Sequence, residues 1–226
     1  PVFLARREFR GVNVTIPYKE AVMPCLDELS ENARLIGSVN TIVNRGGRLC
    51  GFNTDLAGMT AMLRHAGLEL RGRRVLILGT GGTSKTARAA ASKLGAASVT
   101  LVSRGGRAGV SYEDAVRDHA DAEILLNTTP AGMFPQTDGM PIDLACFPRL
   151  CGVADVIYNP LRTRLVLEAQ ARGLPCCGGL YMLAAQAEYA RALFLGEEPR
   201  AELIDRAYLG TLAEKRNIVL IGMPSS

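Results

Sequence analysis

The feature that most constrains the fold is a series of short, continuously apolar segments between residues 73 and 179. The segments "RVLILG", "SVTLVS", "EILLNT" and "GVADVIY" alternate with amphipathic helical patterns, and "LPCCGG" follows one more such pattern. Strands without polar alternation are typical of a parallel sheet that helices cover on both faces. The sequence therefore predicts an α/β fold with a doubly wound, Rossmann-type domain over residues 69–179.

The flanking segments predict a second, smaller unit. "GVNVTIP" indicates a strand that ends at Pro17, "KEAVMPCLDEL" a helix after it, and "SVNTIVN" with "RLCGFNT" a hairpin around residues 45–47. "TDLAGMTAMLRHAG" has the 3.6-residue period and stops at Gly67. Residues 180–215 indicate two further helices. We expect a smaller α/β substrate domain over residues 1–68 that the helices of 180–215 complete.

Composition excludes several classes of protein. The chain has 48% hydrophobic and 21% charged residues and a formal charge of +4, with its arginines scattered. This balance is typical of a globular protein and argues against nucleic-acid binding, and no apolar segment is long enough to span a membrane. The six cysteines form no C-x-x-C motif and the two histidines are not spaced as ligands. We therefore expect no metal site and reduced thiols in a cytoplasmic protein.

The stretch "VLILGTGGTSKTA" can be interpreted in two ways. A nucleotide-kinase P-loop needs glycine immediately before its lysine, and this chain has Ser84 there. A dinucleotide turn needs G-x-G and then a small residue, which Gly79, Gly81 and Ser84 supply after a strand and before a helix. The amides that open the helix would hold the phosphates. The predicted phosphate turn consists of Gly79, Thr80, Gly81, Gly82 and Thr83.

The end of the next strand indicates which dinucleotide binds. An NAD site usually has Asp or Glu there to accept from the ribose 2′-hydroxyl, whereas this chain has Ser103 and Arg104. A guanidinium suits a 2′-phosphate, so we expect NADP rather than NAD. We interpret Lys85, in the helix after the turn, as a solvated charge.

Polar residues that could do chemistry lie at predicted strand ends upstream. Asn13, Thr15 and Lys19 follow the first strand, and Asn40 and Asp55 accompany the hairpin. Taken singly, each has an ordinary structural interpretation, for example a turn residue or a helix N-terminal charge.

Taken in order, the motifs resemble those of the shikimate dehydrogenase family over nearly the whole chain to about residue 214. They are "NVTIPYKE", "GSVNTIV", "GFNTDLAG", "LILGTGG", "LLNTTPAGM", "DVIYNPLRTRLVLEAQARG" and "GLYMLAAQA". The resemblance implies NADP-dependent interconversion of 3-dehydroshikimate and shikimate in aromatic amino-acid biosynthesis. It further implies a catalytic pair, Lys19 and Asp55; substrate contacts at Thr15, Asn40, Asp55, Tyr158 and Gln186; and cofactor contacts at Gly79 to Thr83, Ser103, Arg104, Val156 and Gly179.

The chemistry of these residues agrees with the resemblance. Hydride delivery to a ketone builds negative charge on oxygen, which a lysine held by a carboxylate can neutralise with a proton. Amides and hydroxyls suit a substrate that is recognised through its own hydroxyl groups.

The chain also departs from the family pattern at both ends. The family's opening strand and helix, with a Ser-x-Ser carboxylate-binding segment, are not found, so we expect an N-terminally truncated substrate domain. The tail "NIVLIGMPSS", within residues 216–226, resembles the beginning of a shikimate kinase and suggests a fusion. Three alternative functions remain at this point: a quinate/shikimate dehydrogenase that uses NAD, a non-catalytic ligand-sensing module on the same fold, and a P-loop phosphotransferase.

Overall fold

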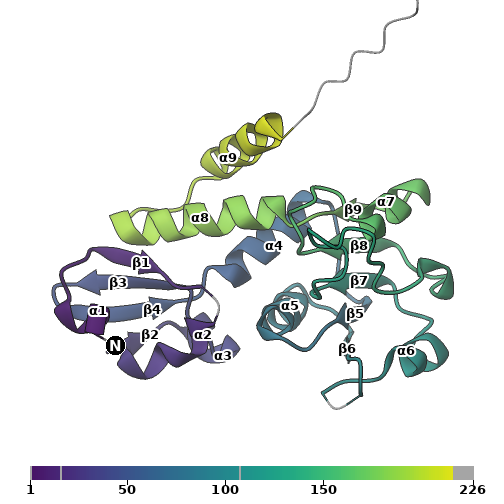
Figure 1. Ribbon diagram of the computed structural model, residues 1–226, viewed down its shortest axis with the longest axis horizontal. Coiled ribbons are helices and arrows are strands. Elements are labelled where there is room, and N and C mark those ends of the chain that lie inside the picture. Colours follow the sequence, from purple (N-terminus) through teal and green to yellow (C-terminus); the bar gives the residue numbers. More distant parts are fainter. Residues whose placement is uncertain (1, 16, 107, 216–226) are drawn as a thin grey trace, which may run out of the picture.

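The computed structural model describes residues 2–15, 17–106 and 108–215, which form two sheets joined by long helices (Figure 1). The predicted kinase-like tail lies outside the described residues. Within those residues, no helix is both long and apolar enough to cross a membrane.

The smaller sheet has the strand order β1-β3-β4-β2. Strands β3 (Thr41–Arg45) and β4 (Arg48–Phe52) form the predicted hairpin. Its two-residue turn has φ of +58° at Gly46 and +89° at Gly47, as a type I′ turn requires. The other elements of this part are α1 (Val2–Arg6), β1 (Gly11–Asn13), α2 (Tyr18–Ala21), the 3₁₀ turn η1 (Met23–Cys25), β2 (Glu28–Leu29) and α3 (Glu31–Ile36).

The single helix predicted for residues 19–29 is wrong. Helix α2 ends at Ala21, and a 3₁₀ turn with Pro24 at its start follows. Proline cannot donate the backbone hydrogen bond that would continue an α-helix. The last two residues of the predicted helix, Glu28 and Leu29, instead pair in parallel with β4. The first strand is also shorter than expected, because β1 ends at Asn13.

The larger sheet is parallel throughout, as the apolar segments predicted, and the structure shows the strand order β6-β5-β7-β8-β9. In chain order this is 2-1-3-4-5, so the connections change direction between β5 and β7. Ligands of doubly wound sheets bind at the carboxyl ends of the strands beside such a switch point. The strands are β5 (Arg74–Leu78), β6 (Ser98–Val102), β7 (Ile124–Asn127), β8 (Gly152–Asp155) and β9 (Cys176–Cys177).

Helices bury both faces of this sheet. One face packs against α4 (Asp55–His65), α5 (Gly82–Lys93) and α8 (Leu180–Leu195). The other packs against α6 (Tyr112–Asp118), α7 (Arg164–Ala171) and the 3₁₀ turn η2 (Leu144–Cys146). The burial of strand side chains on both faces explains why these strands are apolar without alternation.

Helices α4 and α8 connect the two sheets. In Figure 1, α8 lies above the smaller sheet and reaches the larger one with its other end, α4 lies obliquely between the sheets, and α9 (Ala201–Glu214) lies above α8. The α4–α8 contact is close at Gly58, where an added Cβ would lie 2.8 Å from the backbone oxygen of Met182 and 3.2 Å from Cβ of Gln186. The absence of a side chain at Gly58 therefore sets how near α8 approaches the beginning of α4.

We expect Gly58→Ala to lower the free energy of unfolding by about 1–3 kcal/mol, because the new methyl group overlaps the α8 backbone. The matched control is Gly210→Ala in α9, where an added Cβ meets nothing within 4 Å. That control should gain roughly 0.5–1 kcal/mol from helix propensity. Urea denaturation of both variants measures the difference, and equal changes would contradict the close-packing interpretation.

Candidate active site

A lysine–aspartate ion pair lies where α2 meets the beginning of α4. Lys19 Nζ donates to Asp55 Oδ2 at 2.7 Å. The Asp55 side chain is 11% exposed and the Lys19 side chain 27% exposed, so the pair is sheltered while the amine still reaches solvent. A carboxylate in the first turn of a helix is favoured by the partial positive charge of that helix end.

Asn40 holds the other oxygen of Asp55. Its side-chain amide nitrogen donates to Asp55 Oδ1 at 2.9 Å and to Thr54 Oγ1 at 3.0 Å. Its amide oxygen accepts from the Thr54 backbone at 2.8 Å and from the Thr41 hydroxyl at 3.1 Å. Both ends of the amide are thus engaged, which fixes its orientation and leaves Asp55 Oδ2 for Lys19.

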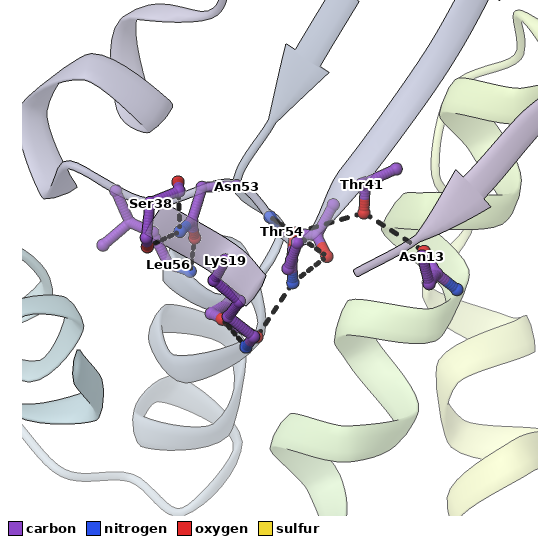
Figure 2. Close-up of polar contacts among 9 residues, drawn as sticks. Asn13, Lys19, Ser38, Thr41, Asn53, Thr54 and Leu56 are labelled. Carbon is purple, nitrogen blue, oxygen red and sulfur yellow. Dashed lines mark hydrogen bonds and ion pairs between the residues drawn. The ribbon is translucent and has the colours of Figure 1, made fainter. Parts of the chain in front are cut away.

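The surrounding polar contacts fix the loop that carries Asp55. A chain of contacts runs from Lys19 through Asp55, Asn40 and Thr41 to Asn13, and Figure 2 shows Lys19 and Asn13 at its two ends. Asn53 donates to the Ser38 carbonyl at 3.0 Å and accepts from the Leu56 backbone at 3.2 Å, so it ties the start of α4 to the loop before β3. A network in which each amide is satisfied rigidifies a site.

A cavity of about 470 Å³ opens beside the ion pair. This volume suits a small-molecule site. Four of the predicted catalytic and substrate residues line it, namely Lys19, Asp55, Tyr158 and Gln186, while Asn40 reaches it through Asp55. Thr15 is exposed and is not among the lining residues. The lining also includes Ser38, Thr86, Met182 and Leu183, which the sequence did not single out.

The glycine turn lies between this cavity and a second one. Gly79 has φ of +106°, and an added Cβ would lie 2.7 Å from Thr128 Oγ1, so both the conformation and the packing require glycine. Gly81 and Gly82 face open space instead, which leaves room for a phosphate beside the N-terminus of α5. These residues fit a dinucleotide.

The predicted cofactor residues divide between the two cavities. The second cavity is lined by Ser103 and Arg104 at the end of β6, together with Thr128 and Thr129 after β7. The Ser103 hydroxyl is buried and has no hydrogen-bond partner among the described residues. Gly79, Thr80 and Gly81 also line the second cavity, whereas Gly82, Thr83, Val156 and Gly179 line the first.

A buried amide–carboxylate pair links the loops that line the two cavities, and sequence reasoning missed it. Asn127 at the end of β7 donates to Asp155 Oδ1 at the end of β8 at 3.1 Å, and both side chains are fully buried. Burial raises the pKa of Asp155 to about 6, against hydrogen bonds from Ile157, Thr163 and Asn127 that lower it. The sequence signal that could have revealed this pair is that the apolar strands β7 and β8 each end in a polar residue, Asn127 and Asp155.

Lys85 is exposed, as the sequence suggested, and it also forms an ion pair that the sequence did not reveal. Its Nζ lies 2.7 Å from Glu20 Oε1, so the ion pair joins α5 of the parallel sheet to α2, which carries Lys19. The two side chains are 48% and 61% exposed. The two residues are 65 positions apart in the sequence, so no local pattern could indicate that they would pair.

A parallel sheet with a glycine turn at its switch point, and a lysine–aspartate pair in the adjoining cavity, define a dinucleotide-dependent oxidoreductase. The family model of the shikimate dehydrogenase substrate binding domain matches residues 3–42. The chain is 37% identical to shikimate dehydrogenase (NADP⁺) of Symbiobacterium thermophilum over an alignment 223 residues long, which covers 89% of this chain and 76% of the relative. The chain belongs to the shikimate dehydrogenase family.

Solved structures agree with this assignment. The fold matches shikimate 5-dehydrogenase from Thermus thermophilus, in complex with NADP(H) and shikimate, with a TM-score of 0.81 and 35% identity over 93% of this chain and 83% of that one. It also matches a chorismate mutase/shikimate 5-dehydrogenase fusion protein from Clostridium acetobutylicum, with a TM-score of 0.87 and 30% identity over 95% of this chain and 80% of that one.

We expect the Glu20–Lys85 ion pair to help hold the two sides of the cleft together. Glu20→Lys or Lys85→Glu alone places like charges opposite each other, so kcat/KM at low salt should fall roughly two- to fivefold. The double reversal restores an ion pair and should recover most of the loss, and high salt should shrink every difference. If the double variant stays as impaired as Lys85→Glu, Lys85 acts on the cofactor phosphates instead.

Proposed function

We propose that this chain reduces 3-dehydroshikimate to shikimate with NADPH, reversibly, in aromatic amino-acid biosynthesis. The observation that carries the proposal is the Lys19–Asp55 pair at 2.7 Å in a cavity that also adjoins the glycine turn. The named relatives are NADP⁺-dependent shikimate dehydrogenases, and the NAD-dependent quinate/shikimate, ligand-sensing and phosphotransferase alternatives are not favoured.

Lys19 is proposed as the proton donor for the reduction. Bound NADPH would supply the hydride to the carbonyl carbon. The carbonyl oxygen would take a proton from the Lys19 ammonium, leaving a neutral amine that regains its proton from solvent. Asp55 accepts a hydrogen bond from Nζ and so orients it, and Asn40 keeps Asp55 in place. In the reverse direction, the neutral Lys19 accepts the hydroxyl proton.

Substrate recognition is proposed to rest on polar side chains around the same cavity. Tyr158, which follows β8, and Gln186, on α8, both line the cavity. Both side chains can form hydrogen bonds with hydroxyl groups of the substrate ring. Asn40 is buried and engaged with Asp55 and Thr54, so its contribution to binding would be mainly through their placement. Thr15 keeps its proposed role only if its exposed hydroxyl faces bound substrate.

We assign residues 1–68 with 180–215 to substrate binding and residues 69–179 to NADP binding, and we place the protein in the cytoplasm. The substrate part would contribute Lys19, Asp55 and Gln186, and the NADP part the glycine turn and Arg104. The proposed fusion to a shikimate kinase rests on the tail sequence alone; the fusion among the structural neighbours joins a chorismate mutase.

Lys19→Met nearly keeps the length of the side chain and removes the ammonium group that is proposed to donate the proton. We expect kcat to fall by about 10²–10⁴-fold with NADP binding retained, because only the proton transfer is lost. Lys93→Met, an exposed lysine in the last turn of α5, is the control and should keep normal turnover. Initial rates of NADP reduction by shikimate provide the measurement, and near-normal turnover would remove Lys19 from the mechanism.

Arg104→Ala tests the preference for NADP. Loss of a charged hydrogen bond to the 2′-phosphate should raise the KM for NADP by about 10- to 100-fold and leave the KM for NAD nearly unchanged. Arg149→Ala is the matched control, since Arg149 is exposed and precedes β8 at the amino end of the sheet, away from the cleft. Equal changes in both KM values would argue against the 2′-phosphate contact.

A further inference from the structure

Asp155 is a buried carboxylate that the proposed chemistry does not use. It closes β8, is fully buried, and lies next to Val156 of the catalytic cavity. Three donors converge on it: Asn127 Nδ2 at 3.1 Å and the Ile157 backbone at 3.0 Å on Oδ1, and Thr163 Oγ1 at 2.7 Å on Oδ2. Burying a carboxylate away from water costs free energy, and three hydrogen bonds are needed to offset that cost here. The presence of Asp155 at this position therefore calls for an explanation.

The hydrogen bond from Ile157 fixes a short segment that forms one wall of the catalytic cavity. Val156 and Tyr158 both line that cavity, and Ile157 lies between them. The segment is clamped from its other side by Gly179, whose backbone donates to the Ile157 carbonyl at 2.8 Å. A Cβ on Gly179 would lie only 1.9 Å from the Val156 carbonyl oxygen. Segment 156–158 is therefore held between Asp155 and the start of α8.

The bond from Thr163 anchors Asp155 to the rest of the domain. Thr163 is the N-cap of α7, where its hydroxyl accepts from the Val166 backbone at 3.4 Å while it donates to Asp155. Helix α7 packs on the face of the sheet away from the catalytic cavity. The wall of the cavity is thus tied to a packed helix through one carboxylate.

Asn127 holds the loop that follows β7 through hydrogen bonds to Thr129. Its Oδ1 accepts from the Thr129 backbone at 3.0 Å and from the Thr129 hydroxyl at 2.7 Å. Thr129 lines the second cavity, beside Ser103 and Arg104. Because these two bonds use Oδ1 whereas Asp155 accepts from Nδ2, the loop at Thr129 does not depend on Asp155 for its own hydrogen bonds.

We propose that Asp155 is a positioning residue that holds segment 156–158 against the nicotinamide half of the cofactor, while Asn127 holds the adenosine half. The proposal rests on the proposed function for what the two cavities bind. It requires that loss of Asp155 weaken binding of the nicotinamide half of the cofactor and leave binding of the adenosine half nearly unchanged. A carboxylate that only stabilised the fold would affect both halves of the cofactor equally.

The test compares NADPH with 2′,5′-ADP, which carries the adenosine half alone. In Asp155→Ala, we expect the Kd for NADPH to rise about tenfold and kcat with shikimate to fall at least tenfold. The Kd for 2′,5′-ADP should change less than twofold. Asp155→Asn should recover most of both losses, because its Oδ1 can still accept from Ile157 and Asn127 and the Thr163 hydroxyl can turn to accept. Isothermal titration and steady-state rates provide these values.

Asp143→Ala, an exposed carboxylate that caps η2 in the same domain, is the matched control and should change neither affinity. If Asp155→Ala does not fold, Thr163→Val removes one of the three donors to Asp155 together with the N-cap bond to Val166, and a smaller selective loss of NADPH affinity is expected. Equal weakening of NADPH and 2′,5′-ADP, or no change in either, would overturn the proposal. If the wild-type chain binds both ligands but does not oxidise shikimate, the proposed function fails, and the binding comparison still decides the role of Asp155.

Discussion

The arrangement of the whole site depends on the close contact between α4 and α8. Helix α4 begins with Asp55, and α8 carries Gln186 and begins beside Gly179, so their separation sets the width of the cavity beside the Lys19–Asp55 pair. Gly58 permits that separation, since any side chain there would overlap the α8 backbone. The same two helices bury one face of the parallel sheet and reach the smaller sheet, so core packing and site geometry are set by one interface.

The carboxylates of Asp55 and Asp155 are held in position by hydrogen bonds from neighbouring groups. Asp55 is held by Asn40 and by its position at a helix N-terminus, and it in turn holds Lys19. Asp155 has no cationic partner among the described residues and relies on three neutral donors, so desolvation raises its pKa. The two carboxylates therefore differ in their proposed roles: Asp55 faces the proposed catalytic amine, and Asp155 is proposed to support a cavity wall.

Much of the fold was predictable because its signals are local. Uninterrupted apolar strands indicated the parallel sheet, two glycines marked the hairpin turn, and Gly67 marked a helix end. The error at residues 19–29 arose where a helical pattern competed with strand pairing. There, hydrogen bonds from β2 to β4 and the missing donor of Pro24 outweighed local helix preference. No local pattern records which distant strand a segment will pair with.

By itself, the sequence determined the class of fold and the glycine turn, because strand patterning and turn chemistry depend on neighbours along the chain. The proposed catalytic pair, Lys19 and Asp55, was indicated only by the resemblance of the ordered motifs to a family. Only the tertiary structure decided which polar groups meet. It brought Lys19 to Asp55 across 36 residues and Lys85 to Glu20 across 65, joined Asn127 to Asp155, and left Thr15 outside the cavity lining. Such contacts depend on how strands and helices pack, and hydrogen bonds act only over a few ångströms once packing has brought the groups together.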